Sequence, residues 1–287
     1  MSVSNVESQS FKSSVRAQWD RSASGWDDHT PQIRAWLAEA TDAMITRAGI
    51  GPGSRVLDVA AGAGDQTLDI AQRVGEQGFV LATDLSPAIL ALARRRLQDA
   101  GHQHVETRVA DGEQQLSLSG PPFDAAVCRL GLMLFPDPRL GLREMHRALR
   151  PGGGIATLVF SRAETNPCIG ILASTALRHA GLPARDPYAP GTLLSLGKPG
   201  RVEELFQAAG FREVVTTTLQ APFALRSADD YLRFVRTSAS PIQQILGGLS
   251  PQAAQAAWSE MGQRLAAFTT SDGWVGPNEL LLTSARR

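Results

Sequence analysis

The sequence is poor in cysteine, in long apolar runs and in lysine. Its 287 residues include two cysteines, Cys128 and Cys168, which are too few for a disulfide framework or a zinc site. No apolar run approaches the roughly 18 residues that a membrane-spanning helix needs. The serine-rich segment 1–10 lacks the basic and apolar regions of a signal peptide. We therefore expect a cytoplasmic protein with no membrane segment and no metal site.

The chain also lacks net charge. Lysine plus arginine (28) equals aspartate plus glutamate (28), and only Lys12 and Lys198 are lysines. A balanced chain has no long-range attraction for nucleic acid or anionic lipid. We therefore expect a neutral or weakly polar small molecule as the partner, and no nucleic acid. The oligomeric state stays open between a monomer and a homodimer.

The centre of the sequence is the stretch Arg55–Asp84. A short apolar run at 55–59 leads into the small-residue turn 62–64, after which apolar residues recur at helical spacing over 68–74. A second apolar run, 79–84, ends in Asp84. This pattern predicts one strand–helix–strand unit with parallel strands.

Acids flank the turn of this unit. Gly62 and Gly64 leave room for a ligand beside the backbone at a helix start. A dinucleotide fingerprint has a third glycine, where this chain has Thr67, and Asp58 and Asp65 are poor neighbours for a pyrophosphate. These two acids suit a cationic ligand instead. S-adenosylmethionine carries a sulfonium, an ammonium and a ribose, and no phosphate.

At this point the chain resembles the class I S-adenosylmethionine-dependent methyltransferases. Residues 58–64 (Asp-Val-Ala-Ala-Gly-Ala-Gly) are similar to the first motif of that family and residues 83–86 (Thr-Asp-Leu-Ser) to the second. The apolar run 130–138 resembles the ubiquinone/menaquinone-biosynthesis C-methyltransferases and related small-molecule enzymes of methyltransferase type 11. Residues 149–154 (Leu-Arg-Pro-Gly-Gly-Gly) are a further match in the expected order. The chain does not carry the Asn-Pro-Pro-Tyr-type signature of DNA amino-methyltransferases.

The resemblance implies an α/β fold, namely a Rossmann-like, doubly wound, seven-stranded sheet with an antiparallel last strand. Further strands are expected at 104–109, 123–129 and 155–160, then at 211–218 after a helix, and at 279–284. Residues 1–10 read as disordered, 19–29 as a short helix plus a loop, and 30–49 as a helix. The expected organisation is an N-terminal helical flap (1–50), a core (51–160, 200–218 and 279–287) and two lid insertions (161–199 and 219–278). The second insertion could instead be an oligomer contact.

The resemblance also implies a cofactor site. Asp84 would accept hydrogen bonds from both ribose hydroxyls, while Gly62 and Gly64 would let the backbone approach the methionine portion. Asp58 would organise the ammonium group, and Asp111 with Gly112 would flank the adenine. The backbone of Arg129 and Leu130 would bound the methionine end. Their neighbours Ala60, Gln66 and Leu85 complete the expected cofactor set.

Substrate and catalytic residues follow less directly. Trp19 and Trp26 either close over the ligand or anchor the N-terminal segment to the core. Met133, from the apolar loop, and Tyr188 are further candidates for substrate contact. His29 and His179 are the candidate general bases because a hydroxyl acceptor usually loses its proton to histidine. Each histidine could also be structural, and an activated carbon or an amine needs no base.

We therefore predict an S-adenosylmethionine-dependent methyltransferase of secondary metabolism acting on a small, largely apolar molecule, such as an aromatic, a quinone or a polyketide-like compound. Two alternatives remain at this point. One is a non-methylating cyclase or binding protein that uses the same fold and cofactor. The other is an NAD(P)-dependent oxidoreductase, which Thr67 and the acids around the turn disfavour.

Overall fold

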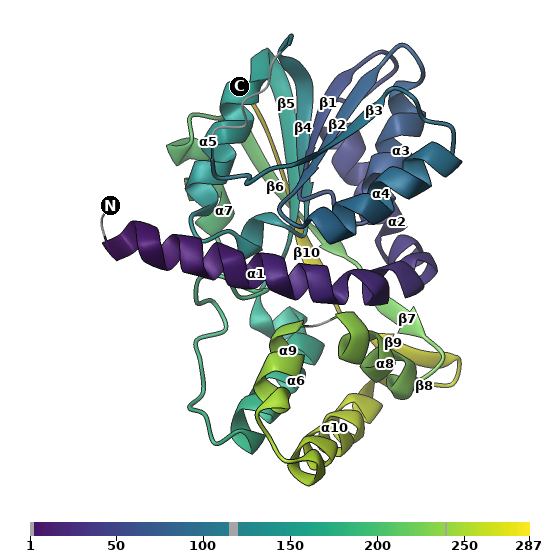
Figure 1. Ribbon diagram of the computed structural model, residues 1–287, viewed down its shortest axis with the longest axis vertical. Coiled ribbons are helices and arrows are strands. Elements are labelled where there is room, and N and C mark those ends of the chain that lie inside the picture. Colours follow the sequence, from purple (N-terminus) through teal and green to yellow (C-terminus); the bar gives the residue numbers. More distant parts are fainter. Residues whose placement is uncertain (1–2, 115–119, 239) are drawn as a thin grey trace.

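The computed structural model describes residues 3–114, 120–238 and 240–287, and its centre is a seven-stranded sheet (Figure 1). The strand order is β3-β2-β1-β4-β5-β10-β6, and β10 runs antiparallel to both of its neighbours. The predicted fold class is therefore confirmed. The strands are β1 (Arg55–Val59), β2 (Phe79–Asp84), β3 (Val105–Val109), β4 (Phe123–Arg129), β5 (Leu149–Phe160), β6 (Arg212–Gln220) and β10 (Glu279–Arg286).

Helices cover both faces of this sheet. On one face α2 contacts α3, and α3 contacts α4, whereas α5 and α7 contact each other on the opposite face (Figure 1). Parallel strands buried on both faces have mostly apolar side chains, and β1 has Val56, Leu57 and Val59 beside the single buried acid Asp58. The helices are α2 (Thr30–Arg47), α3 (Asp65–Val74), α4 (Pro87–Asp99), α5 (Pro138–Ala148) and α7 (Arg201–Ala208).

Local sequence signals fix the starts of two of these helices. The hydroxyl of Ser86 accepts a hydrogen bond from the backbone N–H of Ile89 (3.2 Å), and Pro87 is the first residue of α4. Asp137 caps α5 in the same way, ahead of Pro138. A capping oxygen satisfies a free N–H, and proline has no N–H to lose at that position. These caps place α4 and α5 at the strand ends from which the site is built.

A second hydrophobic cluster lies below the sheet in Figure 1. Most of the second insertion is helical, and it also contains the small sheet β7-β9-β8, which the sequence did not predict. Its strands have two to four residues, too few to display a period in the sequence. The elements here are α6 (Pro167–His179), β7 (Phe223–Leu225), α8 (Ala228–Ser238), α9 (Ser240–Gly247), α10 (Pro251–Leu265), β8 (Thr269–Thr270) and β9 (Gly273–Gly276), while three short 3₁₀ turns lie at Leu132–Leu134, Ala163–Thr165 and Ala266–Phe268.

The N-terminal segment is one long helix, α1 (Val3–Asp28), which crosses between the sheet and the lower cluster (Figure 1). The expectations of disorder over 1–10 and of a loop within 19–29 are wrong from Val3 onwards. Helix α1 contacts α4, α8 and α9, so tertiary contacts stabilise a stretch whose own apolar pattern is weak. Asp20 joins α1 to the start of α4 by accepting hydrogen bonds from the Ser86 hydroxyl (2.5 Å) and the Ala88 N–H (3.3 Å). No helix in the described ranges is both long and apolar enough to cross a bilayer.

Trp274 holds the lower cluster together. It is fully buried, stacks on Tyr231 with 4.6 Å between ring centroids, and donates from Nε1 to the Leu265 carbonyl oxygen (2.7 Å). Trp274→Ala should lower the free energy of unfolding by about 3–5 kcal/mol because it leaves a cavity and an unpaired carbonyl. Chemical denaturation measures this loss, and hydrogen exchange should accelerate first within residues 228–276. Leu182→Ala, at an exposed position, should change stability by less than about 0.5 kcal/mol. Equal losses in the two variants would contradict the assignment.

Candidate functional site

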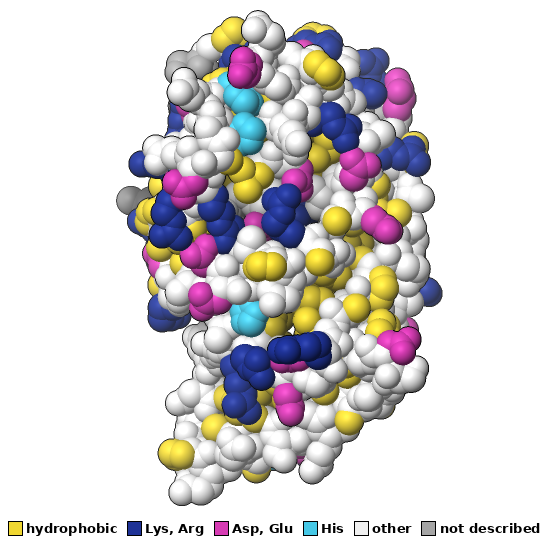
Figure 2. All heavy atoms as spheres, turned by 90° about the vertical axis from the view of Figure 1, so that its right-hand side faces the viewer, with side chains coloured by type: hydrophobic (Ala, Val, Ile, Leu, Met, Phe, Trp, Pro, Cys, Tyr) yellow, Lys and Arg dark blue, Asp and Glu magenta, His cyan; other side chains and the backbone are white. Residues whose placement is uncertain are grey.

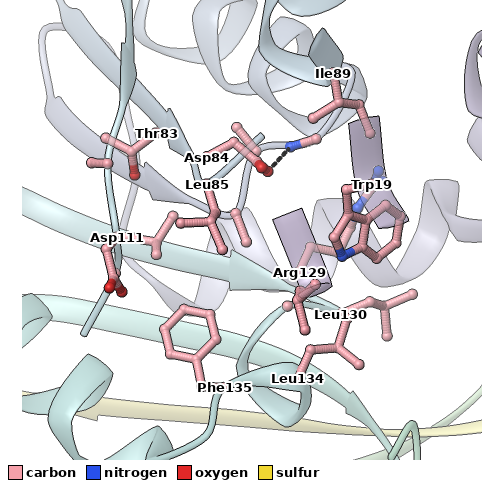
Figure 3. Close-up of a pocket in the computed structure, with 18 of the residues that line it drawn as sticks. Trp19, Thr83, Asp84, Leu85, Ile89, Asp111, Arg129, Leu130, Leu134 and Phe135 are labelled. Carbon is pink, nitrogen blue, oxygen red and sulfur yellow. Dashed lines mark hydrogen bonds between the residues drawn. The ribbon is translucent and has the colours of Figure 1, made fainter. Parts of the chain in front are cut away.

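A cavity opens at the carboxyl ends of β1, β2, β3 and β4. Its lining comes from the turn after β1, from the residues that follow β2, β3 and β4, and from α1, whose Trp19 lies across the cavity from Asp111 (Figure 3). Ligands of open parallel sheets bind at this edge. Of the predicted cofactor and substrate residues, the ones that line it are Trp19, Trp26, Ala60, Gly62, Gln66, Asp84, Leu85, Asp111, Gly112, Arg129 and Leu130.

The two glycines of the turn have different tasks. Gly62 has φ +58° and lines the cavity, and the nearest atom to a Cβ built there is Ile89 Cδ1 at 4.0 Å. Gly64 has φ +86° and does not line the cavity; a Cβ there would lie 2.9 Å from the Ala93 side chain. Glycine adopts positive φ without strain. Gly62 therefore leaves backbone open to a ligand, whereas Gly64 allows the start of α3 to approach α4.

Asp84 connects the ends of two strands. Its Oδ2 accepts from the Gly62 N–H and its Oδ1 from the Ser86 N–H, both at 2.9 Å. Burial raises the pKa of this carboxyl, and the backbone N–H donors lower it in part. Each carboxylate oxygen has more than one lone pair, so Asp84 can still accept from a ligand hydroxyl. In Figure 3 Asp84 lies between Thr83 and Ile89 at the upper edge of the cavity, with Leu85 below it.

Asp58, expected to meet the ammonium group, is fully buried and does not line the cavity. It accepts hydrogen bonds from the Thr67 hydroxyl (2.6 Å) and from Gln66 Nε2 (3.2 Å). The hydroxyl of Thr67 thus occupies the position of the third fingerprint glycine. Burial raises the pKa of Asp58 to about 6. Asp58 thus joins β1 to the first turn of α3. Its hydrogen bond with Gln66 connects it to a residue that lines the cavity.

The sequence analysis missed two charged residues that contact Asp111, namely Lys12 and Glu113. Lys12 Nζ lies 2.7 Å from Asp111 Oδ2 and 2.5 Å from Glu113 Oε2, and both acids lie just after β3. Glu113 Oε1 also accepts from the Asp137 N–H (2.5 Å). Since the chain has only two lysines, a lysine within the N-terminal flap was a usable signal. This contact fixes α1 over the end of the cavity that Gly112 and Asp111 form.

The apolar wall comes partly from residues other than those predicted. Leu134 and Phe135 line the cavity, whereas Met133 is buried in the core and its carbonyl oxygen accepts from the Ser195 hydroxyl (2.6 Å). Tyr188 lies outside the cavity, and its hydroxyl oxygen accepts from the Ala163 N–H (3.1 Å). The short 3₁₀ turn after β4 rotates Met133 inward, which alternation along the sequence does not reveal.

Neither candidate histidine lines the cavity. His29 precedes α2, contacts the Thr237 hydroxyl through Nε2 (3.1 Å) and packs edge-on against Phe234. His179 ends α6, and its Nε2 lies 2.9 Å from a carboxylate oxygen of Glu260. The described residues that line the cavity include no histidine, tyrosine or cysteine. Both histidines lie outside this cavity, and the role of a base for either one stays a prediction.

The sequence comparisons agree with this geometry. Residues 30–171 match the model of the ubiE/COQ5 methyltransferase family. The chain carries a ubiE/COQ5-type methyltransferase domain. It is 35% identical over 125 residues to the ubiquinone/menaquinone biosynthesis C-methyltransferase UbiE of Hahella chejuensis, which covers 44% of this chain and 50% of the relative. It is 32% identical over 148 residues to the demethylmenaquinone methyltransferase of Deinococcus radiodurans, which covers 46% of this chain and 58% of the relative. The chain thus spans about half the length of the curated relatives it matches.

Solved structures share the fold around this methyltransferase domain. The phosphoethanolamine N-methyltransferase 2 of Haemonchus contortus, solved with S-adenosyl-L-methionine, superposes with a TM-score of 0.54 at 18% identity (91% of this chain, 57% of that chain). The [4+2]-cyclase SpnF superposes with a TM-score of 0.52, also at 18% identity (93% and 96%). At these identities the likeness concerns the fold alone.

The buried acid of the methyltransferase domain gives a pH-dependent prediction. The pKa of Asp58 is about 6 in the folded protein against 3.8 ordinarily, so its stabilising contribution is complete below pH 3.8 and is lost as pH rises through about 6. Asp58→Asn removes this titration and keeps an oxygen for Thr67. The melting temperature of the wild type minus that of the variant should therefore fall between pH 4.5 and 7. Asp42→Asn, at an exposed pair with Arg73, is the reference. A difference that stays constant or rises with pH would contradict the assignment.

Proposed function

We propose that this protein is an S-adenosylmethionine-dependent methyltransferase that acts on a small, largely apolar acceptor, such as an aromatic, a quinone or a polyketide-like secondary metabolite. The observation that carries the proposal is the position of Asp84. Its carboxylate lies at the floor of the cavity, fixed by two backbone N–H groups and beside an open glycine turn. This arrangement suits the ribose of a ligand whose other portion is cationic.

The charges around the cavity fit this cofactor. The acids Asp65, Asp84, Asp111 and Glu113 line it, together with the cations Lys12 and Arg129. Four acids against two cations would repel the two negative charges of a pyrophosphate and would attract a sulfonium and an ammonium. Thr67 also takes the position at which a dinucleotide fold needs glycine. These two features favour the methyl donor over a nicotinamide dinucleotide.

Each part of the cofactor has residues of the chain to hold it. Asp84 would accept from the ribose hydroxyls, Asp111 and Gly112 would flank the adenine, and the backbone at Gly62 and Leu130 would bound the methionine portion. The bound cofactor supplies the electrophilic methyl group on its sulfonium. The protein would then orient the acceptor in line with the methyl–sulfur bond and exclude water from the cavity.

The wall around the cavity supports an apolar acceptor. Trp19, Trp26, Ile89, Leu134 and Phe135 line it, and ligand pockets of this composition bind apolar molecules with a few polar groups for orientation. On the face shown in Figure 2, basic side chains lie among acidic ones. Such a mixed surface offers little electrostatic attraction for nucleic acid, which supports a small-molecule substrate.

The described lining contains no histidine, tyrosine or cysteine. This composition limits how an acceptor could lose a proton in the cavity. An acceptor atom that must lose its proton during transfer needs a base nearby. The carboxylates of the described lining already bind Lys12, Arg96 or backbone N–H groups, so the cavity suits an acceptor that is already ionised or electron-rich at neutral pH. The same observation keeps a second candidate open, a protein that binds the cofactor without transferring its methyl group and instead folds an apolar substrate for cyclisation.

Binding of S-adenosylhomocysteine tests the cofactor assignment. Isothermal titration should detect binding to the wild type and no binding of NADH. Asp84→Asn should weaken binding of S-adenosylhomocysteine at least about tenfold because hydrogen bonds to a charged group are lost. Asp99→Asn, at the exposed end of α4, should leave the affinity unchanged. Binding of NADH in place of S-adenosylhomocysteine would refute the proposal.

Methyl transfer separates the two candidate functions. Incubation with methyl-labelled S-adenosylmethionine and a panel of phenols, quinones and polyketide-like acceptors should produce a labelled apolar product, and Asp84→Asn should reduce its formation. Cofactor binding together with conversion of an acceptor to an unlabelled isomer would identify the cyclase instead.

A further inference from the structure

Three consecutive arginines in α4, residues 94–96, have different surroundings. The side chain of Arg95 is 61% exposed, whereas that of Arg96 is 16% exposed. Arg94 is exposed and donates to the Thr107 hydroxyl (3.0 Å), and Arg95 donates to a carboxylate oxygen of Asp27 (3.0 Å). Exposed pairs of this kind contribute little to stability. Arg96 differs, because a guanidinium held away from water needs partners for its five N–H donors.

One side of the Arg96 guanidinium contacts the turn after β1. Its Nη1 donates to the Ala63 carbonyl oxygen (3.1 Å) and to Asp65 Oδ1 (2.9 Å). Ala63 and Asp65 line the cavity, and Arg96 does not. Gly64 brings the turn close to Ala93, which precedes Arg96 by one helical turn on α4. Arg96 therefore holds the turn from outside the space that a ligand would occupy.

The other side of the guanidinium contacts the α1–α2 junction, residues 27–30. Its Nη2 donates to the carboxylate of Asp27, to the Asp27 carbonyl oxygen (3.5 Å) and to the Thr30 hydroxyl at the start of α2. Helix α4 lies beside the C-terminal half of α1 (Figure 1). Asp27 directly follows Trp26, which lines the cavity. A single guanidinium thus joins the turn, through Nη1, to the junction, through Nη2.

A ligand in the cavity would contact both elements that Arg96 joins. The lining includes Gly62 and Ala63 from the turn, and Trp19 and Trp26 from α1. If ligand binding at the turn also orders the junction, the free energy of that coupling is reciprocal. A correctly placed junction then raises the affinity for the ligand, and a loosened one lowers it.

We infer that Arg96 is a positioning residue that couples the turn after β1 to the α1–α2 junction, so that a ligand in the cavity orders the junction and the junction in turn raises the ligand affinity. Arg96 acts through Ala63 and Asp65 on one side and through Asp27 on the other. This inference rests on the proposed function for the identity of the ligand. It requires no particular orientation of that ligand in the cavity.

Arg95 offers a matched control, because it shares the partner Asp27 and, in the described part of the chain, has no hydrogen bond to the turn. With S-adenosylhomocysteine as the probe, isothermal titration should show that Arg96→Met weakens binding about fivefold or more. Arg95→Met should change the affinity less than twofold, since its ion pair is exposed. Arg96→Lys should lie between the two, because an ammonium group cannot replace both sides of a planar fork.

Hydrogen exchange gives a readout that a purely structural role of Arg96 would leave unchanged. Residues 27–33 contain the junction and do not line the cavity. Saturation with S-adenosylhomocysteine should slow their amide exchange in the wild type and in Arg95→Met. In Arg96→Met, saturated at a correspondingly higher concentration, this slowing should fall at least about twofold, while the turn at 60–66 remains protected by the ligand.

The outcomes separate the inference from the proposed function. If the wild type binds no S-adenosylhomocysteine, the proposed function and the coupling both fail. If it binds, equal affinities of Arg96→Met and Arg95→Met refute the coupling alone, as does undiminished protection of residues 27–33 in Arg96→Met.

Should Arg96→Met fail to fold, Asp27→Asn decides. This variant removes a carboxylate that lies outside the cavity and leaves Arg96 paired with Asp65. It should weaken binding of S-adenosylhomocysteine at least about threefold, because a charged hydrogen bond at the junction is lost. Asp28→Asn, at the exposed neighbouring position, should leave the affinity unchanged. Equal affinities of these two variants would refute the coupling.

Discussion

The hydrogen bond from the Gly62 N–H to the Asp84 carboxylate is the interaction on which the site depends. It joins the turn after β1 to the end of β2, and the second oxygen of Asp84 accepts from the Ser86 N–H at the start of α4. Strands β1 and β2 and helix α4 therefore share one half-buried carboxylate. Because the backbone supplies these donors, Asp84 is fixed by the fold and does not depend on the rotamer of a neighbouring side chain. Asp84 also lines the cavity.

Ion pairs and hydrogen bonds of charged side chains hold the N-terminal helix α1 at the cavity. Lys12 meets Asp111 and Glu113 at one end, and Asp20 joins α1 to the start of α4 in the middle. The same helix supplies Trp19 and Trp26 to the wall and contacts α8 and α9 on its other side. Helix α1 is therefore the element through which the two hydrophobic clusters of the molecule adjoin the cofactor site.

The positions of site residues at strand ends could be predicted from the sequence, because regular strand geometry determines them. Asp84 ends one parallel strand and Asp111 follows another, and the carboxyl ends of such strands meet at one edge, so their presence in one cavity follows from spacing. Gly64 and Asp58 could not be assigned in this way, because their tasks depend on contacts with Ala93 and Thr67. Met133 and His29 likewise depend on the rotation of a short turn and on packing against α8. Interactions distant in sequence decide these cases, and no local pattern encodes them.

The central claim is that a glycine turn flanked by acids binds an adenosyl donor through Asp84. A crystal structure of the full chain with S-adenosylhomocysteine tests it most directly. The account predicts that the Asp84 carboxylate lies within hydrogen-bond distance, about 2.5–3.0 Å, of both ribose hydroxyls, in the cavity beneath α1. A ligand bound elsewhere, or a ribose that contacts other residues while Asp84 keeps only its backbone donors, would contradict it.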